Sequence, residues 1–381
     1  MIDDLEISNA LLPVGFCDVL PSDAETEARG LQKMMNIFAN YGYDRVNPPL
    51  LEFEQSLLAH AGKGIAEQTF RIMDPETRYM MGLRADITPQ IARIAATRLI
   101  NSPRPLRLSY AGLCIWVKGA RHSAARQILQ TGIELIGIDN AQADAEVILV
   151  TAQALQALGI QAFSFDLMMP QLVQAIISPE NFTSAQLGAL MRALDRKDVA
   201  AVKYYGGDYS DILTAMLQAA GPADQAIGAL RKLDFPAEAQ RLFERLLASV
   251  KAVRNQDPDI ELTIDPVEFR GWDYHTGLCI SVYADGISGE VGRGGRYLSN
   301  NQEPACGLTL RPDILLQRAE RPLSKSRVFV PYGCHRIEEL SKLHEEGYVT
   351  LMSCAVEDDP AEEAHHLNCQ YIYKKGKLFP L

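Results

Sequence analysis

The chain reads Tyr110-Ala-Gly-Leu-Cys-Ile-Trp-Val-Lys118 and, a few residues later, Arg126-Gln-Ile-Leu-Gln-Thr-Gly-Ile-Glu134. Both stretches predict strands, and residues 118–125 between them predict a polar, exposed loop. The first strand ends near an indole, Trp116, and the second carries an amide and a carboxylate, Gln130 and Glu134. This pair of strands is therefore the first candidate for a functional site.

The pair resembles motif 2 of the class II aminoacyl-tRNA synthetases, and of the histidyl-tRNA synthetases in particular. Their pattern is aromatic-x-Gly-x-x-Phe-Arg-x-Glu, a loop, and Gln-x-x-Gln-x-Gly-x-Glu. In that family the arginine binds the α-phosphate of ATP, whereas Trp116 and Lys118 stand here at the positions of the Arg and the Glu. An indole offers one N–H and no positive charge, and Lys118 reverses the charge beside the adenine end. The resemblance thus implies a degenerate ATP site that lacks the side chains needed to bind and activate ATP.

A second stretch resembles motif 3 of the same family, Pro-Ala-Val-Gly-Phe-x-x-Gly-x-Glu-Arg. It runs Pro304-Ala-Cys-Gly-Leu-Thr-Leu-Arg-Pro-Asp-Ile314, so the final, phosphate-binding arginine is replaced by Ile314. Arg311, at the place of a glycine, is the candidate for a partial substitute. The preceding Gly292-Arg-Gly-Gly295 predicts a tight turn or bulge rather than a phosphate cradle.

The motifs that bind the amino acid in this family are matched more closely than those that bind ATP. Phe269-Arg-Gly-Trp-Asp-Tyr-His-Thr-Gly277 resembles the histidine-recognition signature Arg-Gly-Leu-Asp-Tyr-Tyr-Thr-Gly, and Leu83-Arg-Ala-Asp-Ile-Thr88 resembles the loop Leu-Arg-Pro-Glu-Gly-Thr. The resemblance therefore implies a histidine pocket made by Asp86, Thr88, Gln130, Glu134, Arg270, Tyr274 and His275.

The side chains of this set suit a free amino acid. Asp86 and Thr88 would hold the ammonium group, Arg270 or Gln130 the carboxylate, and Glu134 would accept a hydrogen bond from an imidazole N–H. Any single carboxylate here also has a purely structural interpretation, as a turn cap or ion-pair partner. We expect no catalytic residues, no metal site and no cofactor.

The first part of the chain predicts a mixture of helices and strands. Ser22-Asp-Ala-Glu25 is a capping-box pattern that predicts a helix to about Tyr41. Tyr43 to Leu51 predicts a strand that runs into a double proline and resembles motif 1, the dimer element of the synthetases. A hairpin, 69–73 with 79–84, and a helix at about 88–99 follow.

The remaining sequence predicts an interrupted sheet and a separate small unit. A helix at about 141–158 and a strand at 162–166 precede an alanine- and leucine-rich helical insertion, 168–253, after which strands resume at 261–265 and 277–283. We expect an α+β fold, with a class II synthetase-like antiparallel sheet flanked by helices in residues 1–320. A small C-terminal α/β module is expected in residues 321–381.

Composition limits the class of protein. The chain has 381 residues, 47% of them hydrophobic, and a net charge of −11, which disfavours nucleic-acid binding. Its seven cysteines include no Cys-x-x-Cys pair and are expected to be reduced thiols. The acidic N-terminus and the lack of a long apolar run predict a cytoplasmic protein with no membrane segment.

This combination resembles the regulatory subunits of ATP phosphoribosyltransferase, which are histidyl-tRNA synthetase paralogues. The resemblance implies a non-catalytic chain that activates the short-form catalytic subunit and transmits inhibition by histidine in the first step of histidine biosynthesis. It also implies a homodimer through the motif 1-like region and a hetero-octamer with the partner. Histidine would bind in the relic pocket or at a subunit junction.

Two other functions remain open from sequence. One is a divergent histidine-activating ligase that uses Arg311 or Arg126 to bind phosphate. The other is a synthetase-like module that binds tRNA or regulates a kinase.

Overall fold

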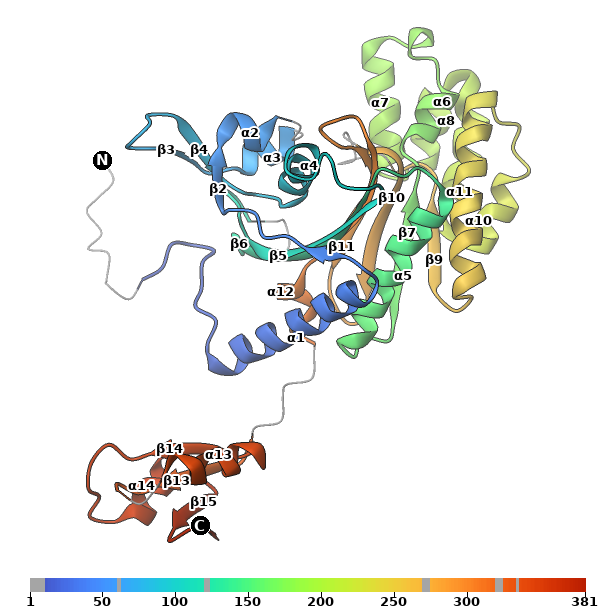
Figure 1. Ribbon diagram of the computed structural model, residues 1–381. Coiled ribbons are helices and arrows are strands. Elements are labelled where there is room, and N and C mark those ends of the chain that lie inside the picture. Colours follow the sequence, from blue (N-terminus) through green and yellow to red (C-terminus); the bar gives the residue numbers. More distant parts are fainter. Residues whose placement is uncertain (1–10, 60–62, 120–123, 269–274, 319–324, 334–335) are drawn as a thin grey trace. The chain divides into compact units, whose positions relative to one another are not determined.

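The computed structural model describes residues 11–59, 63–119, 124–268, 275–318, 325–333 and 336–381. The chain divides into two compact units, Met1–Glu320 and Arg321–Leu381. Figure 1 shows the elements of each.

A nine-stranded sheet forms the centre of the larger unit. Its order is β1 (Asp44–Arg45), β5 (Leu106–Ile115), β6 (Gln127–Ile136), β12 (Pro304–Leu310), β11 (Gly292–Leu298), β10 (His275–Ala284), β7 (Phe163–Met168), β9 (Glu261–Asp265) and β8 (Gly221–Pro222). Neighbouring strands from β5 to β7 are antiparallel, whereas β1 with β5 and β7 with β9 are parallel. The predicted fold class, an antiparallel sheet flanked by helices, is confirmed.

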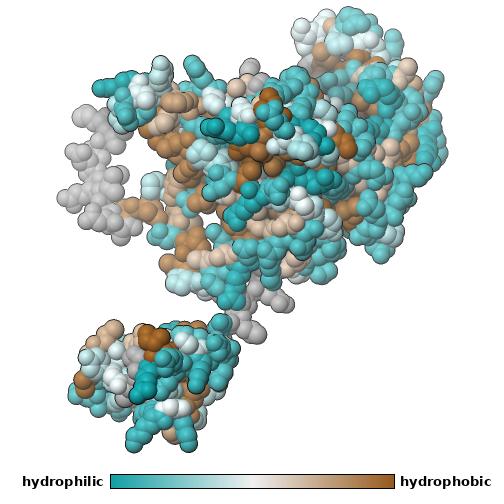
Figure 2. Space-filling model, viewed as in Figure 1, coloured by the Kyte–Doolittle hydropathy of each residue, from teal (hydrophilic) through white to brown (hydrophobic). Residues whose placement is uncertain are grey.

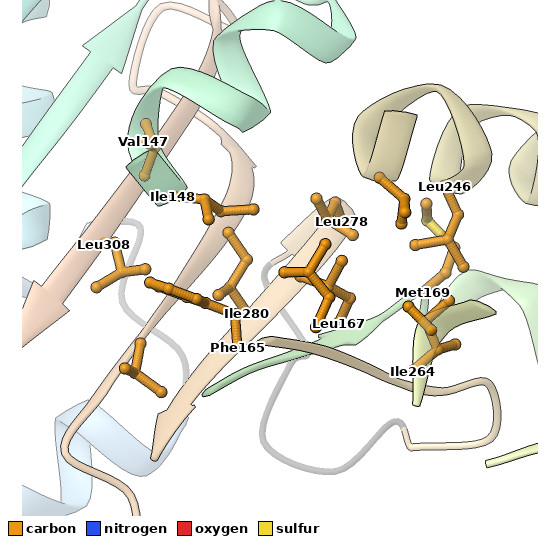
Figure 3. Close-up of a cluster of buried hydrophobic side chains, with 14 of the residues drawn as sticks. Val147, Ile148, Phe165, Leu167, Met169, Leu246, Ile264, Leu278, Ile280 and Leu308 are labelled. Atoms are coloured by element: carbon orange, nitrogen blue, oxygen red, sulfur yellow. The ribbon is translucent and has the colours of Figure 1, made fainter. Parts of the chain in front are cut away.

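One face of this sheet is apolar and packs against α1 (Pro21–Asn40) and α5 (Ala141–Ala157). Because side chains alternate between faces, Ile133 and Leu135 of β6 both point into this core. Figure 3 shows the same core farther along the sheet, with Ile148 of α5 beside Ile280 and Leu308. Burial of this large apolar area is the main stabilising term of the larger unit.

The described residues cover the opposite face only in part. Ile91 and Ala95 of helix α4 (Thr88–Thr97), with the N-cap residue Ile87, pack against Leu106 and Leu108 of β5. Beside it lies a small antiparallel sheet in the order β2 (Leu51–Phe53), β4 (Met80–Leu83) and β3 (Arg71–Met73), with helices α2 (Glu54–Leu58) and α3 (Lys63–Gln68). The part of this face that the described residues leave open is where the predicted site residues gather.

Helices fill the segment between β7 and β9. They are α6 (Gln171–Ile176), α7 (Ser184–Asp195), α8 (Val199–Tyr205), α9 (Ser210–Ala219), α10 (Ala223–Leu230) and α11 (Ala237–Gln256), with short 3-10 turns at Pro179–Asn181 and Gly207–Tyr209. Figure 1 shows them, green to yellow, gathered beside β7 and β9. Helix α11 packs against α5 and α6, so these helices share the core of the sheet.

The smaller unit is a four-stranded sheet in the order β14 (Val349–Met352), β13 (Arg327–Val330), β15 (Tyr371–Lys374) and β16 (Lys377–Pro380). Strand β13 is parallel to both neighbours, and α13 (Ile337–Glu345) and α14 (Pro360–His366) supply the two covering helices. Val328 and Val330 face Leu340 and Leu343 of α13, whereas residue Phe329 faces α14. Strand β16 was not predicted.

Two local predictions about the N-terminal part are wrong. Helix α1 begins at Pro21 and its N-cap residue, Leu20, makes no side-chain cap bond, so Ser22 lies inside the first turn and forms no capping box. Proline fits this first helical position because its φ is already helical and its missing N–H has no partner there. The predicted strand Tyr43 to Leu51 is also two short strands, β1 and β2, because Pro48 and Pro49 cannot donate to a ladder.

The glycines at 292–295, for which a tight turn or bulge was predicted, lie in strand β11 and form no turn. Gly294 lies so close to β12 that a Cβ atom would be 2.0 Å from the carbonyl oxygen of Gly307. The predicted bulge has a counterpart beside them, because the register of β10 with β11 shifts, by a β-bulge or irregularity, between His275 and Cys279, and Cys279 is opposite Gly295, whose φ is 145°. Close approach of two backbones, not turn formation, explains Gly294.

Candidate functional site

A cavity of about 800 Å³ lies on the partly covered face of the large sheet. Five of the seven residues predicted to bind histidine line it, namely Asp86, Thr88, Gln130, Glu134 and His275. The other two, Arg270 and Tyr274, lie outside the described residues. Of the three residues assigned to the lost ATP site, Trp116 and Ile314 line the same cavity, whereas Lys118 is exposed beside it and is not among the lining residues.

Strand alternation brings the polar side chains together. Glu134 on β6 is opposite Leu108 on β5 and Gly307 on β12. Tyr110 and Thr309 are both opposite Gly132, two residues away on the same face. The odd-numbered neighbours on β6, Ile133 and Leu135, point into the core, so the even-numbered Glu134 points into the cavity.

Two glycines make room for these side chains. A Cβ atom at position 307 would be 1.8 Å from Oε2 of Glu134, and one at position 132 would be 2.5 Å from the hydroxyl of Tyr110. Because neither glycine has a side chain, the carboxylate and the phenol lie across the neighbouring strands.

Glu134 is the most deeply placed charged group of the cavity, with 1% of its surface exposed. Thr88 Oγ1 donates to its Oε1 at 2.9 Å, and the hydroxyl of Tyr297 donates to its Oε2 at 2.9 Å. Burial nevertheless raises the pKa of Glu134 to about 8, because desolvation outweighs these donors and the nearby Asp86 adds to the rise. An N–H or ammonium group placed beside it would favour the ionised form.

Asp86 supplies a second carboxyl group in the loop that precedes α4. Its Oδ1 accepts from the backbone N–H of Thr88 at 3.2 Å, and the side chain of Gln130 hydrogen-bonds to it. Burial also raises the pKa of Asp86, against these hydrogen bonds and the charge of Arg293. Two carboxyl groups at one end of a cavity disfavour an anionic ligand and favour a cationic or N–H-rich one.

His275 contributes a neutral imidazole. It begins strand β10 opposite Tyr297 and is 6% exposed. Burial, followed by the charge of Arg293, lowers the pKa of His275 to about 3. Its carbonyl oxygen accepts from Nε2 of Gln171 at 2.6 Å, which ties this wall of the cavity to helix α6.

The other end of the cavity holds Trp116 and Ile314, two of the residues predicted to mark a degenerate ATP site. The indole N–H of Trp116 donates to the carbonyl oxygen of Ala85 at 2.8 Å. The guanidinium of Arg311 lies 5.3 Å from the centre of the Trp116 ring and forms a two-point ion pair with Asp313, at 2.9 and 2.7 Å. Arg311 is therefore already engaged on both sides.

Arg126, the other possible phosphate ligand, is engaged away from the cavity. Its guanidinium lies over the rings of Phe16 and Phe70, at 5.1 and 4.9 Å, and its Nε donates to the carbonyl oxygen of Trp116 at 3.1 Å. Arg126 is not among the residues that line the cavity.

Three contributors had no role assigned from sequence, namely Tyr110, Tyr297 and Thr309. The hydroxyls of Tyr110 and Thr309 lie 2.6 Å apart, and Tyr110 also reaches Glu134 at 3.4 Å. Thr309 stands between Leu308 and Leu310, an alternation that was a usable signal, whereas Tyr110 and Tyr297 follow Ser109 and Arg296 and gave no such pattern.

Neither a cluster of metal ligands nor a membrane-spanning helix is present among the described residues. No group of three or more His, Cys, Asp or Glu side chains there is arranged to hold a metal ion. Within the same ranges, each helix is too short or too polar to cross a bilayer.

Comparison with known proteins identifies the family. The histidyl-tRNA synthetase family model matches residues 15–315. The ATP phosphoribosyltransferase regulatory subunit of Gluconobacter oxydans is 53% identical over 98% of both chains, and that of Paramagnetospirillum magneticum is 47% identical over 96% of both.

Solved structures share the fold. A Bacillus halodurans structure described as an ATP phosphoribosyltransferase regulatory subunit/histidyl-tRNA synthetase has a TM-score of 0.81 at 21% identity, covering 96% of this chain and 98% of that one. Histidyl-tRNA synthetase from a Nostoc species has a TM-score of 0.74 at 18% identity, covering 96% and 90%. Sequence identity of 47–53% to these regulatory subunits extends over nearly the full length of the chain. This chain therefore belongs to the family of ATP phosphoribosyltransferase regulatory subunits, built on the histidyl-tRNA synthetase fold.

Proposed function

We propose that this chain is a non-catalytic subunit that activates the short-form ATP phosphoribosyltransferase catalytic subunit and makes it sensitive to histidine. The observation that carries this proposal is the contrast between the two ends of one cavity. The end at Asp86 and Glu134 holds five of the seven predicted histidine-binding residues, four of them buried, whereas the end at Trp116 and Ile314 offers no cation at either phosphate-binding position.

L-Histidine is the effector that suits the polar end. Its ammonium group would lie near Asp86 and Thr88, and its imidazole N–H would donate to Glu134, whose raised pKa falls when such a donor arrives. A cationic or N–H-donating ligand reduces the unfavourable interaction between these two buried carboxyl groups. This reduction adds to the affinity of the ligand. Histidine would then favour a state of this chain that supports its partner less well, and a coupling of about 1–3 kcal/mol is sufficient for feedback.

A ligase function is less well supported. A ligase would let the histidine carboxylate attack the α-phosphorus of ATP with release of pyrophosphate, and this step requires cationic groups on the phosphates. Arg311 is paired with Asp313 and stacked on Trp116, and Arg126 is held between two phenylalanine rings. A histidine-dependent exchange of pyrophosphate into ATP is the reaction that a ligase would show and a regulatory chain would not.

We also propose that two copies of this chain pair through the motif 1-like region, and that the dimer joins catalytic subunits in a hetero-octamer in the cytoplasm. The small sheet beside this region exposes seven large hydrophobic side chains, Leu50, Leu51, Phe53, Ile72, Met73, Tyr79 and Met80. Figure 2 shows hydrophobic side chains at the surface in the area of β2. Exposed apolar clusters of this kind favour association. Light scattering that gives a monomer alone and no larger species with the partner would refute this assembly.

The function is tested by measuring phosphoribosyl-ATP formation by a short-form catalytic subunit, alone, with this chain, and with this chain plus L-histidine. We expect a large rise in turnover that histidine suppresses. Glu134→Ala should keep the rise but lose much of the suppression, since Glu134 lies in the proposed effector pocket. An unchanged rate, with no association between the two chains, would overturn the proposal.

A further inference from the structure

The loop of residues 84–88, which carries the predicted ammonium ligands, is tied to the β5–β6 hairpin at several successive points. The backbone N–H of Ile115 donates to the carbonyl oxygen of Arg84 at 3.0 Å. The backbone N–H of Ile87 donates to Oε1 of Gln130 at 3.2 Å. Between these two points, the carbonyl oxygen of Ala85 accepts from the indole N–H of Trp116.

The Trp116 contact differs from the Ile115 contact because it depends on a side chain. Ala85 is buried, so its carbonyl oxygen would lose its donor if the indole N–H were removed. A buried acceptor without a partner is costly, and the backbone would move to recover one. The residue next to Ala85 is Asp86, so such a movement would displace a carboxyl group of the pocket.

The Trp116 ring is itself held in place by Arg311, the N-cap residue of helix α12 (Pro312–Leu315). Arg311 lies over the indole at 5.3 Å from its centre, and Asp313 fixes the guanidinium by two hydrogen bonds. Stacking of arginine on an indole is favourable and fixes the plane of the ring. A residue that only filled space would need neither a directed hydrogen bond nor this second contact.

We propose that Trp116 is a positioning residue, and that its indole N–H, held in place by Arg311 and Asp313, fixes the Asp86–Thr88 loop for the ammonium group of the effector. Trp116 and Arg311, at the end of the cavity that resembles a nucleotide site, would thereby support binding of the amino acid at the other end. This inference rests on the proposed binding of an amino acid in the cavity.

The test compares Trp116→Phe, which keeps a ring but removes the donor, with the wild-type chain. Calorimetry would use L-histidine and 3-(imidazol-4-yl)propionate, which lacks the α-amino group. We expect about fivefold weaker binding of L-histidine and a clearly smaller change for the propionate, because Asp86 would contact only the ammonium group, whereas Thr88 also bonds to Glu134 on the imidazole side. Ile314→Val is a matched control, since it alters the same end of the cavity without touching the loop.

A second measurement needs no ligand. We expect the amide protons of Ile87 and Thr88 to exchange with solvent about fivefold faster in Trp116→Phe, with unchanged exchange in β12. Unchanged exchange at Ile87 and Thr88, or equal loss of affinity for both ligands, would overturn the positioning role. Faster exchange in a chain whose wild-type form binds no histidine would support the positioning role and refute the proposed effector.

Discussion

Tyr297 on β11 donates a hydrogen bond to Glu134 on β6 at 2.9 Å, although strand β12 lies between the two. The contact is possible because Gly307, the β12 residue opposite Glu134, has no side chain. Three adjacent strands thus build one buried acid site. Each of the three residues affects the site in a different and separately testable way.

Gly307→Ala should damage the acid site directly. The new Cβ atom would lie 1.8 Å from Oε2 of Glu134, so the carboxyl group must move. We expect a loss of about 1–3 kcal/mol in the free energy of unfolding and at least tenfold weaker histidine binding. Urea denaturation and calorimetry measure the two effects.

The matched control is Gly228→Ala in helix α10, where a Cβ atom would meet nothing within 4 Å. This change should stabilise the chain by roughly 0.5–1 kcal/mol, because alanine loses less backbone entropy than glycine in a helix. Wild-type histidine affinity in Gly307→Ala would show that the carboxyl group does not contact the ligand.

Tyr297→Phe should weaken binding without opening the core. The lost hydroxyl holds down the pKa of Glu134, so that pKa should rise further, and the carboxyl group should become less available to an N–H donor at neutral pH. We expect roughly five- to tenfold weaker histidine binding. Tyr204→Phe, on an exposed tyrosine of α8, should bind histidine like the wild-type chain.

Glu134→Gln should change how stability depends on pH in the absence of ligand. The folded chain holds the Glu134 proton more tightly than the unfolded chain, because burial raises this pKa from 4.5 to about 8. The contribution of the protonated acid is therefore fully present below about pH 4.5 and is lost as the pH rises toward 8, by up to ~1.4 kcal/mol per pH unit. An amide does not titrate, so the variant should gain stability relative to the wild-type chain over this range.

Urea denaturation at pH 5, 6, 7 and 8 measures this difference. Glu244→Gln, on the exposed side of α11, should give a curve parallel to that of the wild-type chain. Parallel curves for Glu134→Gln as well would mean that the carboxyl group is ionised throughout, contrary to the pKa given by its burial.

Most elements of the fold could be predicted from local pattern. The helix at 141–158 is observed as Ala141–Ala157, and the strand at 261–265 as Glu261–Asp265. The pairing of strands could not be predicted in this way, because it joins residues far apart in sequence. Strand β6 pairs with β12, more than 160 residues later, and only tertiary packing selects that neighbour.

The candidate site likewise contains residues that could be predicted from sequence and residues that depend on tertiary packing. The resemblance selected Asp86, Thr88, Gln130, Glu134 and His275, and the structure brings these five to one cavity. Tyr297 was missed because its contact with Glu134 depends on the order β6, β12, β11 rather than on spacing. Arg126 was considered as a phosphate ligand because the rings of Phe16 and Phe70, which hold it elsewhere, come from distant segments.

Asp144 on α5 should be the most sensitive ionic residue for stability. It is 0% exposed, and it pairs with Arg296 of β11 and, at 3.0 Å, with Arg245 of α11. Ser249 donates a further hydrogen bond at 2.6 Å. Removing the carboxylate would leave a buried guanidinium without its main counter-charge, so Asp144→Ala should cost about 3–5 kcal/mol.

Asp139→Ala provides the comparison, because Asp139 contacts the same two arginines at 3.1 Å but is 62% exposed. Solvent screens this outer carboxylate, so its loss should cost less than ~1 kcal/mol. Urea denaturation of the two variants therefore distinguishes the effect of burying the carboxylate from the effect of pairing it, because both variants keep Arg245 and Arg296. Equal losses would mean that contact with the arginines, not burial of Asp144, determines how strongly α11 is held to the strand that carries Tyr297.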